Sequence, residues 1–302
     1  LSPYSFLIRN NGNGSFDPAW QGRLGLVTDV VWHNTDEDEA LELIAVGDWM
    51  SPKVLDVVDQ EFAIKTLKGA ENLNGFWKTI EIADINDDGA EDILLGNLGE
   101  NTKFKASEAQ PIYLYLDDFD ENEQLDPIIF YNFFGRYRPF NTKEDLAAQM
   151  PMIKKRFTSF QKFATVDNIK ALTGKNEDEI VKIKKVNTLA STVLLKGDQG
   201  YTVQTLPQEA QYSNIRDFHW DDAHKRLYYV GNAQEFVTEL GNVAANPGGV
   251  LEIGKSGTPL FSHLEFLPLP VRFNLRKIIP LAPATFLLVT NNDYVYLKKK
   301  KK

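Results

Sequence analysis

The stretch DINDDGAEDILLGN, residues 84–97, decides how this chain is interpreted. Oxygen-bearing side chains stand at positions 1, 3, 5 and 9 of the stretch, and these are Asp84, Asn86, Asp88 and Asp92. Gly89 stands at position 6, where a sharp turn needs a backbone angle that a side chain resists. Ala90 at position 7 can offer only its backbone carbonyl, and an apolar run typical of a β-strand follows.

This donor spacing predicts a calcium site. Ca²⁺ takes about six to eight oxygen ligands and accepts carboxylates, amides and carbonyls together, in the spacing of the first part of an EF-hand loop. Position 12 is Leu95 and not a glutamate, so the loop leads into a strand. We therefore expect a structural Ca²⁺ on the five donors at positions 1, 3, 5, 7 and 9. A solvated acidic turn is the alternative.

Weaker copies of the pattern occur in three other segments. Segment 118–126 has glutamate at position 6 and keeps the donors Asp118, Asp120, Asn122, Gln124 (carbonyl) and Asp126, and we expect a metal there too. Segment 34–42 also has glutamate at position 6 and keeps Asn34, Asp36, Asp38, Ala40 (carbonyl) and Glu42, as a weaker metal candidate. Segment 217–232 has the pattern out of register, so we expect a turn without metal there.

The fold class follows from short strands and from the repeat. Runs with strand character are separated by turns such as NNGNG at 10–14 and NDDG at 86–89, which is typical of a sandwich or a propeller. The acidic segments recur after 50 and 34 residues, and repeats of about 40–50 residues with several strands each favour propeller blades. We expect an all-β propeller with blades at 1–140 and 188–297, a mostly helical insertion at 141–187, and a lysine tail at 298–302 outside the fold.

The expected strands are 5–9, 26–32, 42–46, 54–58, 62–66, 79–83, 92–95, 112–115, 127–133, 192–196, 201–205, 226–230, 250–253, 261–266, 277–280, 285–290 and 294–297. In the insertion, Thr142 followed by Asp145 predicts a helix N-cap. MIKKRF and TVDNIKAL predict further short helices.

Three longer stretches extend the pattern beyond single loops. They are VTDVVWHNTDEDEALELIAVGDWM (27–50), GFWKTIEIADINDDGAEDILLGNLGENTKFKAS (75–107) and PIYLYLDDFDENEQLDPIIFY (111–131). Together they resemble the FG-GAP or VCBS repeats of β-propellers, and in their order the C-terminal part of cartilage acidic protein-like surface proteins. The resemblance implies an integrin α-like propeller with Ca²⁺ in its loops. It also implies an exported lipoprotein, longer than this chain, at the cell surface or outer membrane.

Composition excludes some classes of function. The net charge is −9, and the five terminal lysines contribute +5 of it, which leaves −14 for the rest of the chain. An acidic body argues against nucleic acid as a partner, because phosphates need a basic face. With no cysteine the chain has neither disulfides nor thiolate metal sites, and no apolar run reaches the roughly 20 residues of a membrane span.

No motif of an enzyme stands out. The four histidines are not spaced as zinc ligands, and the chain has no GxSxG, P-loop or strand-linked GxGxxG. We therefore expect no catalytic residues and a non-enzymatic surface binding or scaffold module, an accessory of an outer-membrane nutrient uptake complex. The alternatives are a lectin-like propeller that binds carbohydrate, for which the aromatic and arginine-rich segment 128–140 is a candidate platform, and a polysaccharide lyase or hydrolase.

Overall fold

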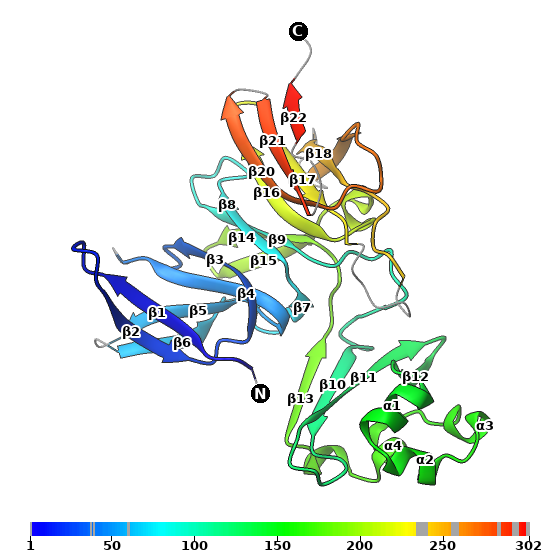
Figure 1. Ribbon diagram of the computed structural model, residues 1–302. Coiled ribbons are helices and arrows are strands. Elements are labelled where there is room, and N and C mark those ends of the chain that lie inside the picture. The colour runs from blue at the N-terminus through cyan, green and yellow to red at the C-terminus, as the bar shows by residue number, and fades with distance from the viewer. Residues whose placement is uncertain are drawn as a thin grey trace. The chain divides into compact units, whose positions relative to one another are not determined.

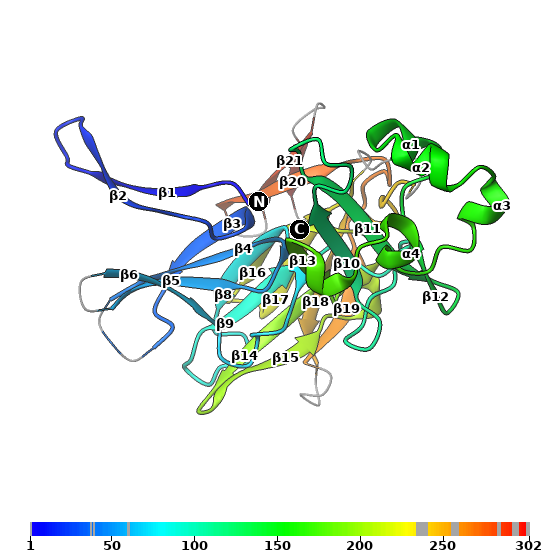
Figure 2. The same cartoon turned by 90° about the horizontal axis from the view of Figure 1, so that it is seen from below.

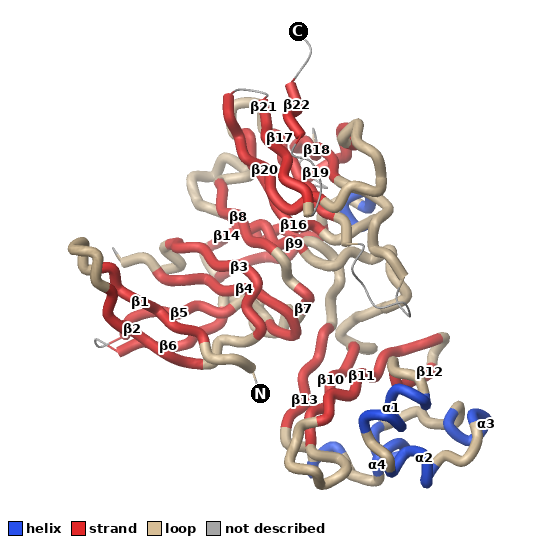
Figure 3. Tube along the Cα trace, in the orientation of Figure 1, coloured by secondary structure: helices blue, strands red, loops and turns tan. Residues whose placement is uncertain are grey.

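The computed structural model describes residues 2–36, 38, 40–58, 61–233, 241–254, 260–282, 285–291 and 296–299. The chain divides into two compact units. The first unit comprises Leu1–Thr102 and Leu189–Lys302, and the second unit comprises Lys103–Thr188. Figure 1 follows the chain through both units, and Figure 3 shows that the α-helices belong to the second unit.

The first unit is built of antiparallel sheets. The first sheet holds β3 (Leu26–His33), β4 (Glu42–Met50), β5 (Lys53–Val58) and β6 (Glu61–Thr66), with β7 (Gly75–Phe76) beside β4. The second sheet holds β8 (Thr79–Ala83), β9 (Asp92–Gly96), β14 (Thr192–Gly197) and β15 (Gly200–Thr205). The third holds β16 (Ile215–Asp221), β17 (Arg226–Gly231), β18 (Gly248–Ile253) and β19 (Phe261–Phe266). The fourth holds β20 (Leu275–Ala282), β21 (Thr285–Thr290) and β22 (Tyr296–Lys299), and β1 (Ser5–Asn10) with β2 (Phe16–Gly22) forms a separate hairpin.

Successive sheets contact each other through their first strands. β3 packs against β8, β8 against β16, and β16 against β20. In two of these contacts an aspartate that follows a register shift in its strand accepts a backbone N–H of the next sheet. Asp29 Oδ2 accepts from the Ile80 nitrogen at 3.1 Å, and Asp217 Oδ2 accepts from the Ile278 nitrogen at 2.7 Å. The same kind of hydrogen bond, from a backbone N–H to an aspartate, thus joins the first sheet to the second and the third to the fourth.

Apolar side chains fill the spaces between neighbouring sheets. The first and second sheets share a core around Trp77, which is fully buried and donates its indole N–H to the Met50 carbonyl at 3.0 Å. Another core joins the second and third sheets around Leu94 and Phe218, and a further one joins the third and fourth around Leu275. Figure 2 shows the strands of the second and third sheets from another side. Each sheet is therefore stabilised mainly by its neighbours in the chain.

The second unit is a sheet covered by short helices. Its strands are β10 (Ile112–Asp117), β11 (Asp126–Phe133), β12 (Arg136–Pro139) and β13 (Lys182–Val186). Its helices are α1 (Lys143–Gln149), α2 (Met152–Arg156), α3 (Phe160–Phe163) and α4 (Ile169–Thr173), with a 3₁₀ turn at Glu177–Glu179. Ile128, Phe130, Leu146 and Leu172 meet in its core. The chain leaves the first unit after β9 and returns at β14, which pairs with β9, so this unit is an insertion within the second sheet.

Most of the sequence-based expectations for secondary structure are confirmed. The mostly β content and the helices after Thr142 are present, and the Thr142–Asp145 capping box forms as predicted. The prediction missed β2, β7, β12, β13 and β16. Among the described residues, no helix is long and apolar enough to cross a bilayer.

The boundaries of the units differ from those expected. The inserted unit begins at Lys103 and includes its own sheet, whereas the sequence placed a mostly helical insertion at 141–187. The difference arises because β10 and β11 have the same acidic loop and strand pattern as the hairpins of the first unit. Lys298 and Lys299, which the sequence placed in a tail outside the fold, belong to β22, because pairing with β21 uses backbone groups and does not depend on the side chain. Residues 300–302 lie outside the described part.

Candidate metal centres

The three acidic loops occupy equivalent places in three hairpins. They connect β3 to β4, β8 to β9, and β10 to β11. In each hairpin the residue before loop position 1 pairs with the residue at position 9, and these pairs are His33 with Glu42, Ala83 with Asp92, and Asp117 with Asp126. The alignment of the three segments in the sequence therefore corresponds to one structural register.

The loops also share their hydrogen bonds. The carboxylate at position 9 accepts the N–H of position 2 in all three: Glu42 from Thr35 (2.6 Å), Asp92 from Ile85 (3.2 Å) and Asp126 from Phe119 (3.2 Å). The side chain at position 5 accepts the N–H of position 7: Asp38 from Ala40 (2.6 Å), Asp88 from Ala90 (2.8 Å) and Asn122 from Gln124 (2.8 Å). These bonds curl each loop and leave further side-chain oxygens directed inward.

In the loop at 34–42 three carboxylates converge. One oxygen from each of Asp36, Asp38 and Glu42 lies within 4.8 Å of the other two. Glu42 is 1% exposed, and its Oε1 is buried without a hydrogen-bond partner among the described residues, as is Asn34 Oδ1. Thr35 holds the other glutamate oxygen through its N–H and its hydroxyl. Buried acceptors without partners are costly, and a cation between them would satisfy them.

In the loop at 118–126 the same convergence occurs. Oxygens of Asp118, Asp120 and Asp126 lie within 4.8 Å of one another. Asp120 Oδ1 is buried and has no hydrogen-bond partner in the described part of the chain. Asp126 Oδ1 accepts a hydrogen bond from Gln149 Nε2 at 2.8 Å, which orients this buried carboxylate.

The loop at 84–92, the best match by sequence, does not contain such a group of three carboxylates, and its third position is Asn86. Asp84, Asp88 and Asp92 do not bring three oxygens together within 4.8 Å, although all residues of this loop are described. Asp92 is fully buried, and its two oxygens accept the N–H groups of Ile85 and Lys196. Burial raises the pKa of Asp92, its hydrogen bonds oppose this, and Asp88 and Asp84 raise it further. Asp84 Oδ1 is buried without a partner among the described residues, so this loop too holds one inward oxygen.

The loops at 84–92 and 118–126, which are described in full, both have positive φ at positions 4 and 6. Asp87 and Gly89 have φ of 59° and 86°, and Glu121 and Glu123 have φ of 62° and 67°. The glycine at position 6 is therefore not required for the turn, because Glu123 adopts the left-handed conformation in its place. In the loop at 34–42 the corresponding residues, at 37 and 39, lie outside the described part.

The fourth acidic segment forms a shorter turn. Asp221 pairs with Arg226, so only four residues connect β16 to β17. Lys225 Nζ contacts Asp222 at 2.6 Å and Asp87 of the second sheet at 2.5 Å, and His224 Nδ1 lies 2.9 Å from Asp221. The Lys225 ammonium group thus lies between two carboxylates of this turn and of the loop at 84–92. The segment accordingly links two sheets by an ion pair.

Two residues that support the loop at 118–126 could not be found from the sequence pattern. Gln149 ends α1, and Lys175 follows α4, where its Nζ lies 3.1 Å from Asp117 Oδ1 and 3.0 Å from the Asp118 carbonyl. Both come from the helical part of the second unit. No local spacing in the sequence indicates that they approach this loop.

The aromatic segment at 128–140 forms the hairpin of β11 and β12. Phe134 at its tip is 93% exposed and has φ of 50°. The ring of Phe133 packs edge-on against the ring of Phe134, with 4.7 Å between the ring centroids. A shallow pocket of about 460 Å³ lies beside the tip and is lined also by Arg136 and Arg138. The tip is therefore presented to solvent, whereas Phe130 and Tyr131 belong to the core.

The donors of all three loops are carboxylate, amide and carbonyl oxygens, which hard cations prefer. Such a donor set fits Ca²⁺ better than Mg²⁺, because Mg²⁺ retains more of its water. A comparison with models of known protein families gives no match for this chain, and a comparison with curated proteins gives none either. The assignment of these loops therefore depends on their own residues and geometry.

Proposed function

We propose that this chain is a calcium-stabilised, non-enzymatic binding module with the fold of an FG-GAP or VCBS β-propeller. The observation that carries the proposal is the convergence of three carboxylates within 4.8 Å in two loops of one shared register. Like charges this close repel unless a cation lies among them. A bound Ca²⁺ would fix the loop between two strands and so make each hairpin more rigid.

The arrangement of sheets supports the propeller part of the proposal. The first, second and third sheets follow one another in the chain. Each contacts the next through its first strand, and apolar cores fill the spaces between them. Blades of a propeller pack in this way. The sheet of the second unit has the same hairpin loop, so we regard it as a related sheet inserted into the second blade.

From the resemblance we infer that the module lies at the cell surface or outer membrane as part of a longer lipoprotein. There we propose an accessory role beside an outer-membrane nutrient importer, with a protein or an extracellular glycan or peptide as partner. Co-purification with a membrane barrel would support this role. Binding on a glycan array without turnover would support a lectin-like role instead, and release of products from a polysaccharide would overturn the non-enzymatic assignment.

The calcium part is tested by thermal unfolding in Ca²⁺, in Mg²⁺ and in chelator, with calorimetric titration to count the ions. A ligand that binds only the folded state stabilises it, by about 2.7 kcal/mol at a concentration 100 times its dissociation constant. We expect a higher midpoint in Ca²⁺ than in Mg²⁺, and a smaller rise for Asp84→Ala and Asp88→Ala if the middle loop binds an ion. An unchanged midpoint on removing Ca²⁺ would refute the proposal.

A further inference from the structure

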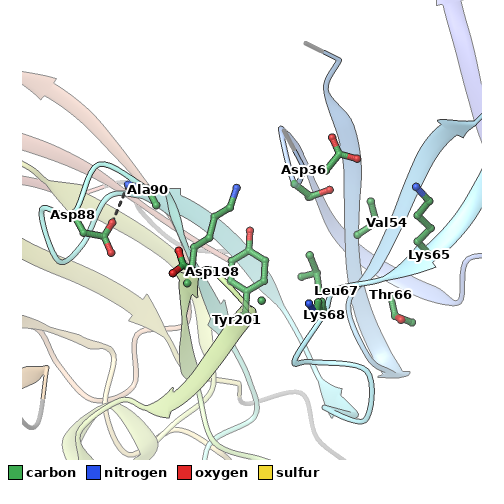
Figure 4. A pocket seen from close by; sticks show the side chains of 14 residues that line it. Asp36, Val54, Lys65, Thr66, Leu67, Lys68, Asp88, Ala90, Asp198 and Tyr201 are labelled. Atoms are coloured by element: carbon green, nitrogen blue, oxygen red, sulfur yellow. Dashed lines mark hydrogen bonds between the residues drawn. The ribbon is translucent and has the colours of Figure 1, made fainter. Parts of the chain in front are cut away.

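The first unit contains a pocket of about 670 Å³ between its first and second sheets. This size is typical of sites for small molecules. Figure 4 shows that Val54 and Lys65 lie on one side and Asp198 and Tyr201 on the other. Asp36 and Asp88, from two of the metal loops, also line the pocket.

The floor of the pocket is apolar and carries one polar group. Val54, Leu67 and Tyr201 are buried in the core shared by the two sheets. The Tyr201 side chain is 7% exposed, and its hydroxyl has no hydrogen-bond partner in the described part of the chain. In Figure 4 this hydroxyl points toward the space between Asp36 and Asp88. A ligand oxygen there would satisfy a buried hydroxyl that is otherwise left without a partner.

The rim of the pocket carries three lysines. Lys65 forms an ion pair with Asp56. Lys68 and Lys196 have no carboxylate within 4.0 Å among the residues that the structure describes. The backbone of both lysines is fixed, since the Lys68 carbonyl accepts the Tyr201 N–H at 2.8 Å and the Lys196 N–H donates to Asp92 at 2.9 Å. Their ammonium groups are therefore available to an anion.

The metal loops change the charge of this pocket. Without metal, three aspartates of the lining, Asp36, Asp88 and Asp198, outnumber the two available lysines. Ca²⁺ in the loop at 34–42, where the carboxylates converge, would neutralise Asp36. Loading of this loop would thus remove the excess negative charge of the pocket and favour the binding of an anion.

We propose that this pocket binds an organic anion of the size of one or two sugar units, and that Ca²⁺ in the adjacent loops strengthens the binding. The anionic group would bind the ammonium groups of the rim. The apolar side of the ligand would lie on Val54 and Leu67, with a hydroxyl or ring oxygen at Tyr201. The dependence on Ca²⁺ rests on the proposed calcium loops, whereas recognition of the anion by the lysines does not.

The experiment is calorimetric titration of the full chain with glucuronate, glucose 6-phosphate and glucose, in Ca²⁺ and in chelator. We expect at least one anion to bind more tightly than glucose, and the two anions distinguish a carboxylate from a phosphate ligand. Lys68→Gln and Lys196→Gln should each weaken binding about tenfold, as expected for loss of one charge-assisted hydrogen bond. Tyr201→Phe should weaken it less, and Lys170→Gln, an exposed lysine of the second unit, should leave it unchanged.

The outcomes separate the two proposals. Equal binding of glucose and the anions, absence of binding by both anions, or lysine variants that bind as the wild type would each overturn the pocket assignment. If the anions bind through the lysines but Ca²⁺ changes neither the midpoint nor the affinity, the pocket stands and the calcium proposal fails. If Ca²⁺ raises the midpoint and no anion binds, the pocket assignment alone is wrong.

Discussion

Replacing Asp120 by asparagine should have opposite effects on stability with and without calcium. Asp120 lies within 4.8 Å of the carboxylates of Asp118 and Asp126, and its buried oxygen accepts no hydrogen bond among the described residues. The substitution keeps the shape and removes one of three like charges. Without metal this relieves two repulsive pairs and should stabilise the fold. With Ca²⁺ it removes a charged ligand and should weaken the stabilisation by the ion.

The size of the effect follows from the spacing of the oxygens. The oxygens lie at most 4.8 Å apart, and two unit charges at that distance repel by about 0.9 kcal/mol in water and by about 3.5 kcal/mol at an effective dielectric constant of 20. Asp118 and Asp120 are partly exposed, so the value in water is the better guide. Relief of two pairs should therefore stabilise the metal-free protein by about 1–2 kcal/mol.

The assay is urea unfolding of the wild type, Asp120→Asn and Glu121→Gln, each in Ca²⁺ and in chelator. Glu121 is the neighbouring residue and loses the same charge, but it lies outside the converging group. The control should therefore show a small effect of the same sign in both conditions. If Asp120→Asn destabilises the protein equally with and without Ca²⁺, the three carboxylates do not repel as argued and do not hold an ion.

Three further substitutions test other features. Trp77→Ala should lower the free energy of unfolding by about 3–5 kcal/mol, since it empties a fully buried site between two sheets; a small loss in urea unfolding would show that the sheets do not depend on this core. Glu81 has its pKa raised to about 7 by burial and by Asp217, while Lys277 opposes the rise. The folded state then holds a proton that the unfolded state loses near pH 4.5. The free energy of unfolding of the wild type should therefore fall as the pH rises from about 4.5 to about 7, by at most roughly 3 kcal/mol. Glu81→Gln should flatten that part of the profile, and an unchanged slope would assign it to other groups. Phe134→Asn should raise the free energy of unfolding by about 1 kcal/mol, because asparagine tolerates φ of 50° better and Phe134 is almost fully exposed; a lower free energy of unfolding would show that the packing of its ring on Phe133 outweighs this gain.

Much of the secondary structure could be predicted because the strands are locally encoded. Apolar runs bounded by asparagine, aspartate and glycine gave most strand positions, and the Thr142 cap gave the first helix. The strands that were missed lack this pattern. β16 contains His219 and Trp220 in a degenerate repeat, and β13 is rich in lysine. The insertion of one sheet between β9 and β14 could not be predicted either, because strand pairing across that distance leaves no local trace.

The two groups of converging carboxylates lie in segments that the sequence proposed as metal sites, but which of the three segments bring carboxylates together could not be predicted. The sequence favoured the loop with Gly89, because five donor positions and the glycine agree there. In the structure the carboxylates converge instead in the two loops that lack this glycine. At 84–92 the third position is Asn86, which donates its side-chain N–H to Asp88 at 2.9 Å and so occupies an oxygen that could face a cation. Whether an amide at that position turns its oxygen or its nitrogen inward depends on the neighbouring side chain and not on spacing.

Glu123 offers an independent argument that the loop at 118–126 is maintained for a ligand. It holds φ of 67°, close to the 86° of Gly89, and Glu121 two residues earlier holds 62°. A side chain in this conformation costs on the order of 1 kcal/mol, and such strain persists only where the surroundings over-determine it. Hydrogen bonds from the N–H groups of Asn122 and Glu123 to Asp118 supply part of that determination. They also leave Asp118 and Asp120 facing Asp126, a repulsive arrangement that a solvated turn has no reason to keep and that a bound cation would make favourable.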